Sequence, residues 1–338
     1  MRIYSLDAFR AIACFFIVFI HTPINGEVGQ IFLPITRIGV PFFFMVTGFF
    51  LFKNNKEKIK KNIIKMFKLA VVANLIYFIW NVLLLLLRGK SIVEYLYNVF
   101  SIKSILQLLL LNQSPFGGHL WYLTAMLYVL IIYYFVNNTK YEKVVKYLVP
   151  LFLIIDLMLG KYSLVLFNRE FPYLLVRNFL FVGLPYFYIG NIIRGLFEKE
   201  RIEKINNIIL LFGCCLFSIT SIFEKYILVN INKNTTRDHY ISTTLLVITL
   251  FILLAKNRNF LKGSKLNKIG GDLSLGIYII HPIIITIFEV GMKIMPNSMK
   301  NIYGYISPFV IFLSSIILVS LYKIVVKKMK DNNVQHSA

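Results

Sequence analysis

Long apolar runs recur along the whole chain and are separated by short polar segments rich in Lys and Asn. A helix that crosses the hydrocarbon core of a bilayer needs about 20 mainly apolar residues. Suitable runs cover residues 6–23, 34–52, 66–87, 119–137, 144–160, 179–197, 207–223, 240–255, 272–291 and 305–326, of which 144–160 and 240–255 are short. The pattern predicts an all-α protein, a polytopic integral membrane bundle of about ten transmembrane helices.

The polar segments between these runs predict the orientation of the bundle. If both termini are cytoplasmic, the inner segments hold about twice as many Lys and Arg residues as the outer ones, as expected of a membrane protein. The stretch SIKSILQLLLL, residues 101–111, is too short to span and is expected to be re-entrant or interfacial. We therefore expect one transmembrane domain over residues 1–330 and a cytoplasmic tail over residues 331–338.

Composition and charge narrow the function classes. Apolar residues make up 58% of the chain and charged residues 15%, whereas soluble proteins have about 45–50% and about 25%. A net charge of +22 would suggest nucleic acid for a soluble protein. In a membrane protein, basic loops instead meet anionic lipid. We expect membrane lipids as partners and no nucleic acid, and we expect no metal because no candidate ligands lie at a metal-binding spacing.

The first apolar run, YSLDAFRAIACFFIVFIH, carries two ionisable groups, Arg10 and His21. Ionisable residues inside a membrane span are costly and are functional candidates by default. At about 100° per residue the two side chains share one helix face, about 16 Å apart along the axis. The alternative is that Arg10 snorkels to the interface and His21 caps the helix end before Pro23.

Two further motifs place polar groups at membrane depth. In GGHLWYL, residues 117–123, His119 and Trp121 open a predicted helix at its outer end, where an aromatic belt is the alternative explanation. In SLGIYIIHP, residues 274–282, the side chains of Ser274, Tyr278 and His281 fall on one helical face. Hydrogen bonding between helices is the alternative there.

Two outer clusters complete the candidates. Arg177 precedes a predicted span and is expected to bind an anion or a lipid headgroup. Arg237, Asp238 and His239 precede another span, and their adjacency is typical of a surface ion pair. Nucleophile-elbow, phosphate-loop, zinc-protease and dinucleotide-binding motifs do not occur in the sequence.

The motifs taken together resemble those of the acyltransferase-3 family of bacterial membrane proteins. The resemblance rests on the helix-1 Arg followed eleven residues later by His, then RIGVPFFFMVTGFFL (residues 37–51), GGHLWYL and SLGIYIIHP, in that order over nearly the whole chain. HLWYL and RNFLFVGLPYFYIG look most like the membrane domains of vancomycin-resistance serine racemases and of small single-domain O-acyltransferases.

The resemblance implies an O-acyltransferase in the bacterial plasma membrane. Such a protein would move an acyl group, often acetyl, from cytoplasmic acyl-CoA to a hydroxyl of an envelope carbohydrate or a related acceptor. His21 would be the base or acyl relay, and Arg10 would hold the donor, since a guanidinium binds phosphate bidentately. Arg37 and Lys53 are further candidates for donor binding. The expected acceptor residues are His119, Trp121, Arg177, Ser274, Tyr278 and His281.

A second hypothesis is transport without acyl transfer, of a serine-like small molecule or of a polysaccharide. Polar residues along the first helix would suit a translocation path as well as an active site. The sequence carries no internal repeat of the kind found in many secondary transporters, which favours acyl transfer.

Overall fold

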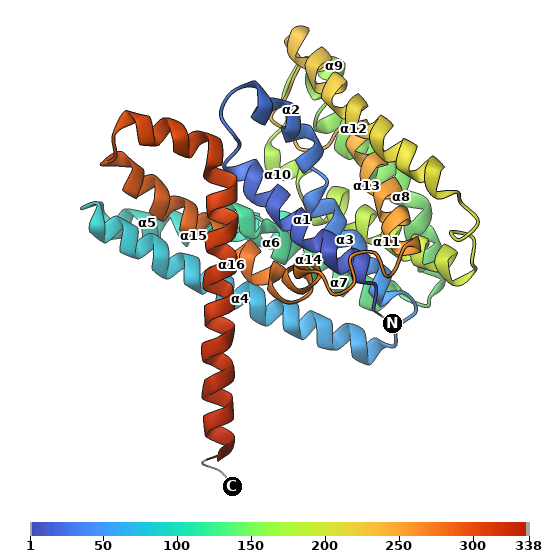
Figure 1. Cartoon of the computed structure of the whole chain (residues 1–338), viewed down its shortest axis with the longest axis horizontal. Coiled ribbons are helices and arrows are strands. Elements are labelled where there is room, and N and C mark those ends of the chain that lie inside the picture. Colours follow the sequence, from blue (N-terminus) through green and yellow to red (C-terminus); the bar gives the residue numbers. More distant parts are fainter. Residues whose placement is uncertain (1, 336–338) are drawn as a thin grey trace. The chain divides into compact units, whose positions relative to one another are not determined.

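The computed structural model describes residues 2–335, and these form helices and connecting turns with no β-strand among them (Figure 1). The elements are α1 (Tyr4–His21), α2 (Glu27–Thr36), α3 (Gly39–Leu51), α4 (Lys56–Leu87), α5 (Ile92–Val99), α6 (Ile102–Leu111), η1 (Gly118–Leu120), α7 (Trp121–Val136), α8 (Lys140–Leu159), α9 (Ser163–Phe167), α10 (Tyr173–Val176), η2 (Phe179–Gly183), α11 (Leu184–Glu198), α12 (Asn207–Asn230), α13 (Ile241–Lys256), α14 (Lys265–Lys268), η3 (Ile269–Leu273), α15 (Ser274–Lys293) and α16 (Asn297–Gln335).

The helices confirm the all-α membrane bundle that the apolar runs predict. Within the described residues, eight helical segments are long and apolar enough to cross a membrane. All ten predicted runs are helical, but the two short ones, in α8 and α13, are not among the eight. In the predicted tail, residues 331–335 continue α16, and residues 336–338 lie outside the described part of the chain.

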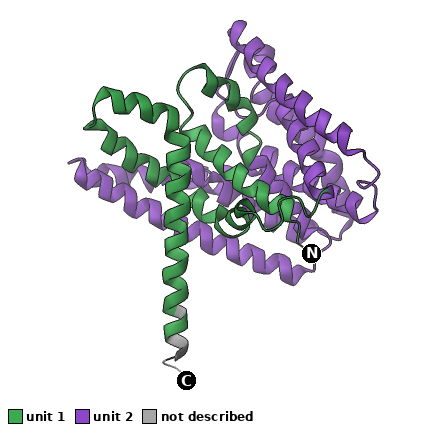
Figure 2. Cartoon of the chain, in the orientation of Figure 1, with its two compact units in different colours: residues 1–39, 257–338 green, residues 40–256 purple. Residues whose placement is uncertain are grey.

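The chain forms two compact units (Figure 2). Unit 1 consists of residues 1–39 and 257–338, and unit 2 consists of residues 40–256. In unit 1, α1 packs against α14, η3, α15 and α16, and α15 also packs against α16. The aliphatic side chains of Val18, Ile284, Ile285 and Ile311 form a buried cluster there. The two ends of the chain therefore build one unit around α1.

Close backbone approach fixes α1 against the start of α15. A Cβ atom at Gly270, in η3, would lie 1.8 Å from the carbonyl oxygen of Asp7 on α1. No larger residue fits there without moving one of the two segments. Farther along, the Cys14 thiol donates to the Ser274 carbonyl oxygen at 3.3 Å. These contacts set the position from which α15 continues beside α1.

Unit 2 is held by similar contacts between small residues. A Cβ at Gly48 would lie 1.9 Å from the Phe187 carbonyl oxygen, and one at Gly190 would lie 1.9 Å from that of Met45. The backbones of α3 and α11 therefore touch, as is common where membrane helices pack through small residues. Other pairs in this unit are α4 with α7, α8 with α11, and α12 with α13.

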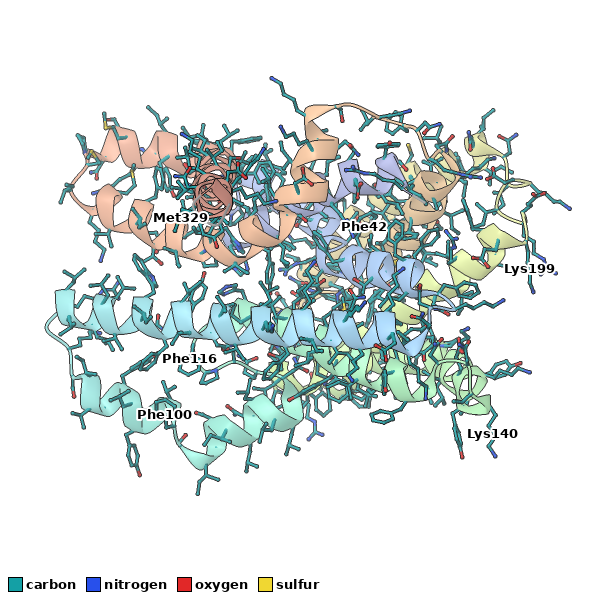
Figure 3. The ribbon with its side chains drawn as sticks, turned by 90° about the horizontal axis from the view of Figure 1, so that it is seen from below. Phe42, Phe100, Phe116, Lys140, Lys199 and Met329 are labelled. Carbon is teal, nitrogen blue, oxygen red and sulfur yellow. The ribbon has the colours of Figure 1, made fainter. Side chains whose placement is uncertain are left out.

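Side chains at the two ends of unit 2 are visible in Figure 3. Phe100 and Phe116 lie together beside α4, with ring centroids 6.3 Å apart. Lys140 and Lys199, from two segments predicted to be cytoplasmic, lie at the same end of the unit. The orientation of that end relative to the bilayer stays a prediction.

A π-helical turn precedes one long helix in each unit. The turn η2 leads into α11 in unit 2, and η3 leads into α15 in unit 1. Such turns are rare and are often found at functional sites. Asn178 supports η2, because its side-chain oxygen accepts from the backbone N–H groups of Leu180 and Phe181.

Candidate functional site

Two histidines from different helices face each other in unit 1. The imidazole rings of His21 and His281 have centroids 5.2 Å apart and planes inclined by 46°. His21 is the last residue of α1 and is exposed, whereas His281 lies within α15 and has 0% exposure. The structure therefore brings together one accessible and one buried imidazole that are 260 positions apart in the sequence.

The packing beside the rings explains why they meet. Val18 lies one turn before His21 on α1, and Ile284 and Ile285 lie one turn after His281 on α15. These three side chains belong to the same buried cluster. The α1 helix ends at His21, since Pro23 follows and cannot continue it. After Pro23, the Asn25 backbone N–H donates to the Gly304 carbonyl oxygen at 2.9 Å. This hydrogen bond connects the segment after α1 to α16.

The hydrogen bond of His281 determines which ring nitrogen carries its proton. Nδ1 lies 3.2 Å from the Ile277 carbonyl oxygen, one turn earlier. A carbonyl oxygen can only accept, so the neutral ring holds its hydrogen on Nδ1 and its lone pair on Nε2. The Tyr278 ring, 6.1 Å away, packs beside it. The predicted face of α15 thus buries Tyr278 and His281, while Ser274 at its start is half-buried.

A carboxylate at the other end of α1 binds two arginines. The Asp7 oxygens accept from Arg10 Nη1 at 3.1 Å and from Arg2 Nε at 2.8 Å. The hydrogen bond and the charge of Asp7 raise the pKa of Arg2 above its usual value. Sequence analysis names Arg10 as a candidate but misses Asp7, which lies three residues before it, a spacing at which helix side chains meet. Asp7 orients the guanidinium of Arg10.

The other two candidates for donor binding fall in different units. Arg37 directly follows α2 in unit 1 and is half-buried. Lys53, in unit 2, is exposed and has a backbone φ of 50°, and its ammonium lies 5.2 Å from the Phe52 ring centroid. Each is a basic side chain next to a helix end.

The structure joins two of the predicted acceptor residues in unit 2. The Arg177 guanidinium lies 5.3 Å from the Trp121 ring centroid. His119, two residues before Trp121, is buried with its ring centroid 4.5 Å from that of Tyr77 on α4. A Cβ at Gly117 would press on the His119 ring at 3.1 Å, so a glycine suits this position. Arg177 and Trp121 therefore act as a pair, and His119 packs against α4.

The cluster expected to be a surface ion pair is instead buried. His239 has 7% exposure and Arg237 has 8%. The partner of His239 is Asp156 in α8, whose Oδ2 lies 2.8 Å from Nδ1 and whose side chain is 3% exposed. Sequence analysis missed Asp156, although a carboxylate within the apolar run 144–160 is itself a functional signal. The expectation of a surface location was wrong, and the partner on α8 cannot be found from adjacency in the sequence, because the fold brings α8 to His239.

Neither polar site gathers a metal-binding set. Within residues 2–335, no three His, Cys, Asp or Glu side chains converge in a way that could hold a metal ion. The unit 1 residues described above offer two imidazoles, a tyrosine and an arginine–carboxylate pair.

Comparison with known proteins identifies the family of the chain. The family model described as an acyltransferase domain, acyltransferase-3, matches residues 3–325. Among curated proteins, the chain is similar to an amino-acid racemase of Enterococcus faecalis, with 28% identity over 331 residues. That alignment covers 89% of this chain but 44% of the relative, so the chain spans less than half of its length. No solved structure matches the chain.

Proposed function

We propose a function from the premise that this chain belongs to the acyltransferase-3 family of membrane proteins. The proposal is that it transfers an acyl group, acetyl in the first instance, from cytoplasmic acyl-CoA to a hydroxyl of an envelope carbohydrate or a related acceptor. The protein would act in the bacterial plasma membrane with both termini in the cytoplasm. The observation that supports it best is the His21–His281 pair in unit 1.

The pair supplies the base that O-acylation needs. In the proposed step, the His21 imidazole takes the proton from the acceptor hydroxyl, and the oxygen attacks the thioester carbonyl carbon. The carbon–sulfur bond then breaks, and the imidazolium returns the proton to the CoA thiolate. His21 is exposed and can reach a substrate, whereas His281 is fully buried and suits the role of a positioning residue.

Basic residues support binding of the donor. CoA is polyanionic, and a planar guanidinium matches phosphate oxygens in pairs. Arg10, oriented by Asp7 near the N-terminal end of α1, is the proposed contact for the donor. Arg37 and Lys53 are proposed to add positive charge toward the same molecule. The distance of about 16 Å between Arg10 and His21 along α1 suits an extended thioester arm.

The acceptor is proposed to bind beside the imidazole pair. Ser274 and Tyr278 share the face of α15 that carries His281, and their hydroxyls suit a carbohydrate. His119, Trp121 and Arg177 in unit 2 are proposed as further acceptor contacts. Trp121 in particular offers an aromatic face, a common surface for sugar rings.

One experiment separates acyl transfer from transport. The protein in lipid nanodiscs is mixed with radiolabelled acetyl-CoA and candidate hydroxyl acceptors, and release of free CoA and labelling of the acceptor are followed. We expect both in the wild type and neither in His21→Ala, with Thr22→Ala as the neighbouring control. Thioester cleavage that persists unchanged in His21→Ala would reject this site. A protein that neither binds nor cleaves acetyl-CoA would favour the transport hypothesis.

A further inference from the structure

A small polar pocket lies within unit 2, at the C-terminal end of α8 and beside the segments around α10 and before α13. Its lining includes Asp156, Lys161, Tyr173, Arg177, Arg237 and His239. The enclosed part of the cavity is just large enough for one water-sized group, and the cavity with its open mouth has about 220 Å³ of atom-free space. A single ligand oxygen could therefore occupy the enclosed part, while the rest of the ligand lies in the mouth.

Two guanidinium groups share one aromatic ring in this pocket. The Arg177 guanidinium carbon lies 4.1 Å from the Tyr173 ring centroid, and that of Arg237 lies 4.8 Å from it. Both distances are within the range of a cation–π contact. Like charges held this close repel each other, and an anion between them would relieve that repulsion.

Both arginines also hold a buried donor that has no acceptor. The Nε atoms of Arg177 and Arg237 are inaccessible and make no hydrogen bond. The terminal nitrogens of Arg237 are engaged, since Nη1 donates to Thr236 at 3.1 Å and Nη2 donates to the Phe171 carbonyl oxygen and lies 3.6 Å from Glu170. An unsatisfied buried donor costs about 1–3 kcal/mol. The two Nε groups are covered by neighbouring atoms, so a ligand that brings acceptor oxygens reaches them only by displacing part of that cover.

The carboxylates of the pocket contact other groups. Asp156 binds His239, and the Tyr173 hydroxyl donates to Asp238. Among residues 2–335, Arg177 makes two ring contacts and has no carboxylate within ion-pair distance. The lining holds three cations, Lys161, Arg177 and Arg237, and two aspartates, and the Glu170 carboxylate lies 3.6 Å from Arg237. Arg177 is therefore the guanidinium of this set that an added anion can pair with.

We propose that this pocket binds the carboxylate group of a small organic anion, with Arg177 as the main donor and Arg237 as the second. A carboxylate is planar, carries a single charge and matches the guanidinium fork. A phosphate dianion carries more negative charge and would be repelled more strongly by Asp156 and Asp238. The carboxylate belongs to a free acid or to a sugar acid, and the proposal does not depend on acyl transfer at His21.

Trp121 provides a direct reporter of binding. The chain has two tryptophans, so Trp80→Phe leaves Trp121 alone, with its ring 5.3 Å from the Arg177 guanidinium. The protein in nanodiscs is titrated with acetate, glucuronate, inorganic phosphate and chloride at constant ionic strength. We expect a saturable change of fluorescence with acetate or glucuronate, and none with chloride. The better of the two carboxylates identifies the source, and equal responses to all four anions would overturn the proposal.

Variants test the assigned donors. Arg177→Gln is expected to weaken carboxylate binding at least tenfold, and Arg177→Lys is expected to weaken it less, because one charge remains. Arg201→Gln, which removes an exposed arginine of the same unit, is the matched control and should bind as the parent does. If Arg177→Gln folds poorly, carboxylate-dependent stabilisation against heat is compared in Arg177→Lys and the parent. Unchanged binding in both Arg177 variants would overturn the proposal.

A final binding measurement, on His21→Ala, distinguishes this site from the proposed acyl-transfer site. His21→Ala should bind the carboxylate with the affinity of the parent protein, because His21 belongs to unit 1 and is not part of the pocket lining. Loss of binding in His21→Ala with an intact fold would overturn the placement of the site in unit 2.

Discussion

The two units build their polar sites in different ways. In unit 1, the histidines stand on the long helices α1 and α15, and aliphatic packing next to the rings brings them together. In unit 2, the charged groups come from the end of α8 and from the irregular segments on either side of α10 and before α13. The geometry of a site on two long helices depends on how those helices pack, whereas the geometry of a site on loops depends on many separate hydrogen bonds.

The contacts of the charged groups at the two sites follow the same division. In unit 1, Asp7 binds arginines three and five residues away along the chain. In unit 2, Asp156 and His239 are 83 positions apart, and Arg237 reaches Phe171 across 66 positions. Contacts between neighbours in sequence stabilise one end of a helix, whereas contacts between distant residues stabilise the packing of separate segments. We therefore expect substitutions of the unit 1 histidines to affect mainly chemistry, and substitutions of Asp156 or His239 in unit 2 to affect mainly stability.

The largest effect is expected for the buried imidazole of unit 1. His281→Gln keeps a similar size but removes the imidazole that positions His21, and it should lower the rate of acyl transfer about 10²-fold. The rate of CoA release with a saturating acceptor measures this, with circular dichroism to check the fold. Full activity in His281→Gln would show that His21 acts without this partner.

The next effect is a loss of stability in unit 2. His239→Leu leaves the buried Asp156 carboxylate without its imidazole and should lower the free energy of unfolding by about 3–5 kcal/mol. The double variant Asp156→Leu/His239→Leu should recover most of this loss, because no buried charge remains. Unfolding in detergent by titration with a denaturing surfactant measures both. A double variant as unstable as the single one would contradict the pairing.

A smaller effect is expected where α1 meets η3. Gly270→Ala forces a methyl group against the Asp7 carbonyl oxygen and should cost about 1–3 kcal/mol of stability. Gly291→Ala on α15, where a Cβ meets nothing within 4 Å, is the control and should be neutral or slightly stabilising. Thermal unfolding of the two variants gives the comparison, and equal midpoints would argue against the close packing of α1.

The smallest effect is expected at the exposed end of unit 1. The Arg2 side chain is 53% exposed, so solvent screens its bond to Asp7, which should contribute little to stability. Arg2→Gln should therefore unfold nearly as the wild type does and should keep its apparent KM for acetyl-CoA. Arg10→Gln, by contrast, is expected to raise that KM about tenfold. Equal KM changes in the two variants would contradict the assignment of Arg10.

The sequence predicts the helices well because each apolar run is a local property. It also predicts His21 and His281 as candidates, because an imidazole in an apolar run stands out. It does not predict that the rings lie 5.2 Å apart, since that distance depends on how α1 and α15 pack. The same holds for Gly270, whose role appears only when the Asp7 backbone is beside it.

The site in unit 2 is harder to predict for a physical reason. Arg237, Asp238 and His239 are neighbours in sequence, and neighbours in an exposed loop commonly pair with each other. Burial changes this outcome, because a desolvated imidazole needs a partner with fixed geometry, and Asp156 on α8 supplies it. The signal for Asp156 was local, but its partner could be found only in the folded chain.

The π-helical turn η3 determines which side of α15 each following side chain lies on. A π turn is an α-helical turn that contains one extra residue. Deleting one residue from Ile269–Leu273 would restore the α-helix and turn everything after it by about 100° relative to what comes before. His281 would then leave the side of α15 that meets His21, although no residue of the pair had changed. An insertion after Lys293 would not change the position of His281 relative to His21. Length changes should therefore be harmful before His281 and tolerated after the end of α15.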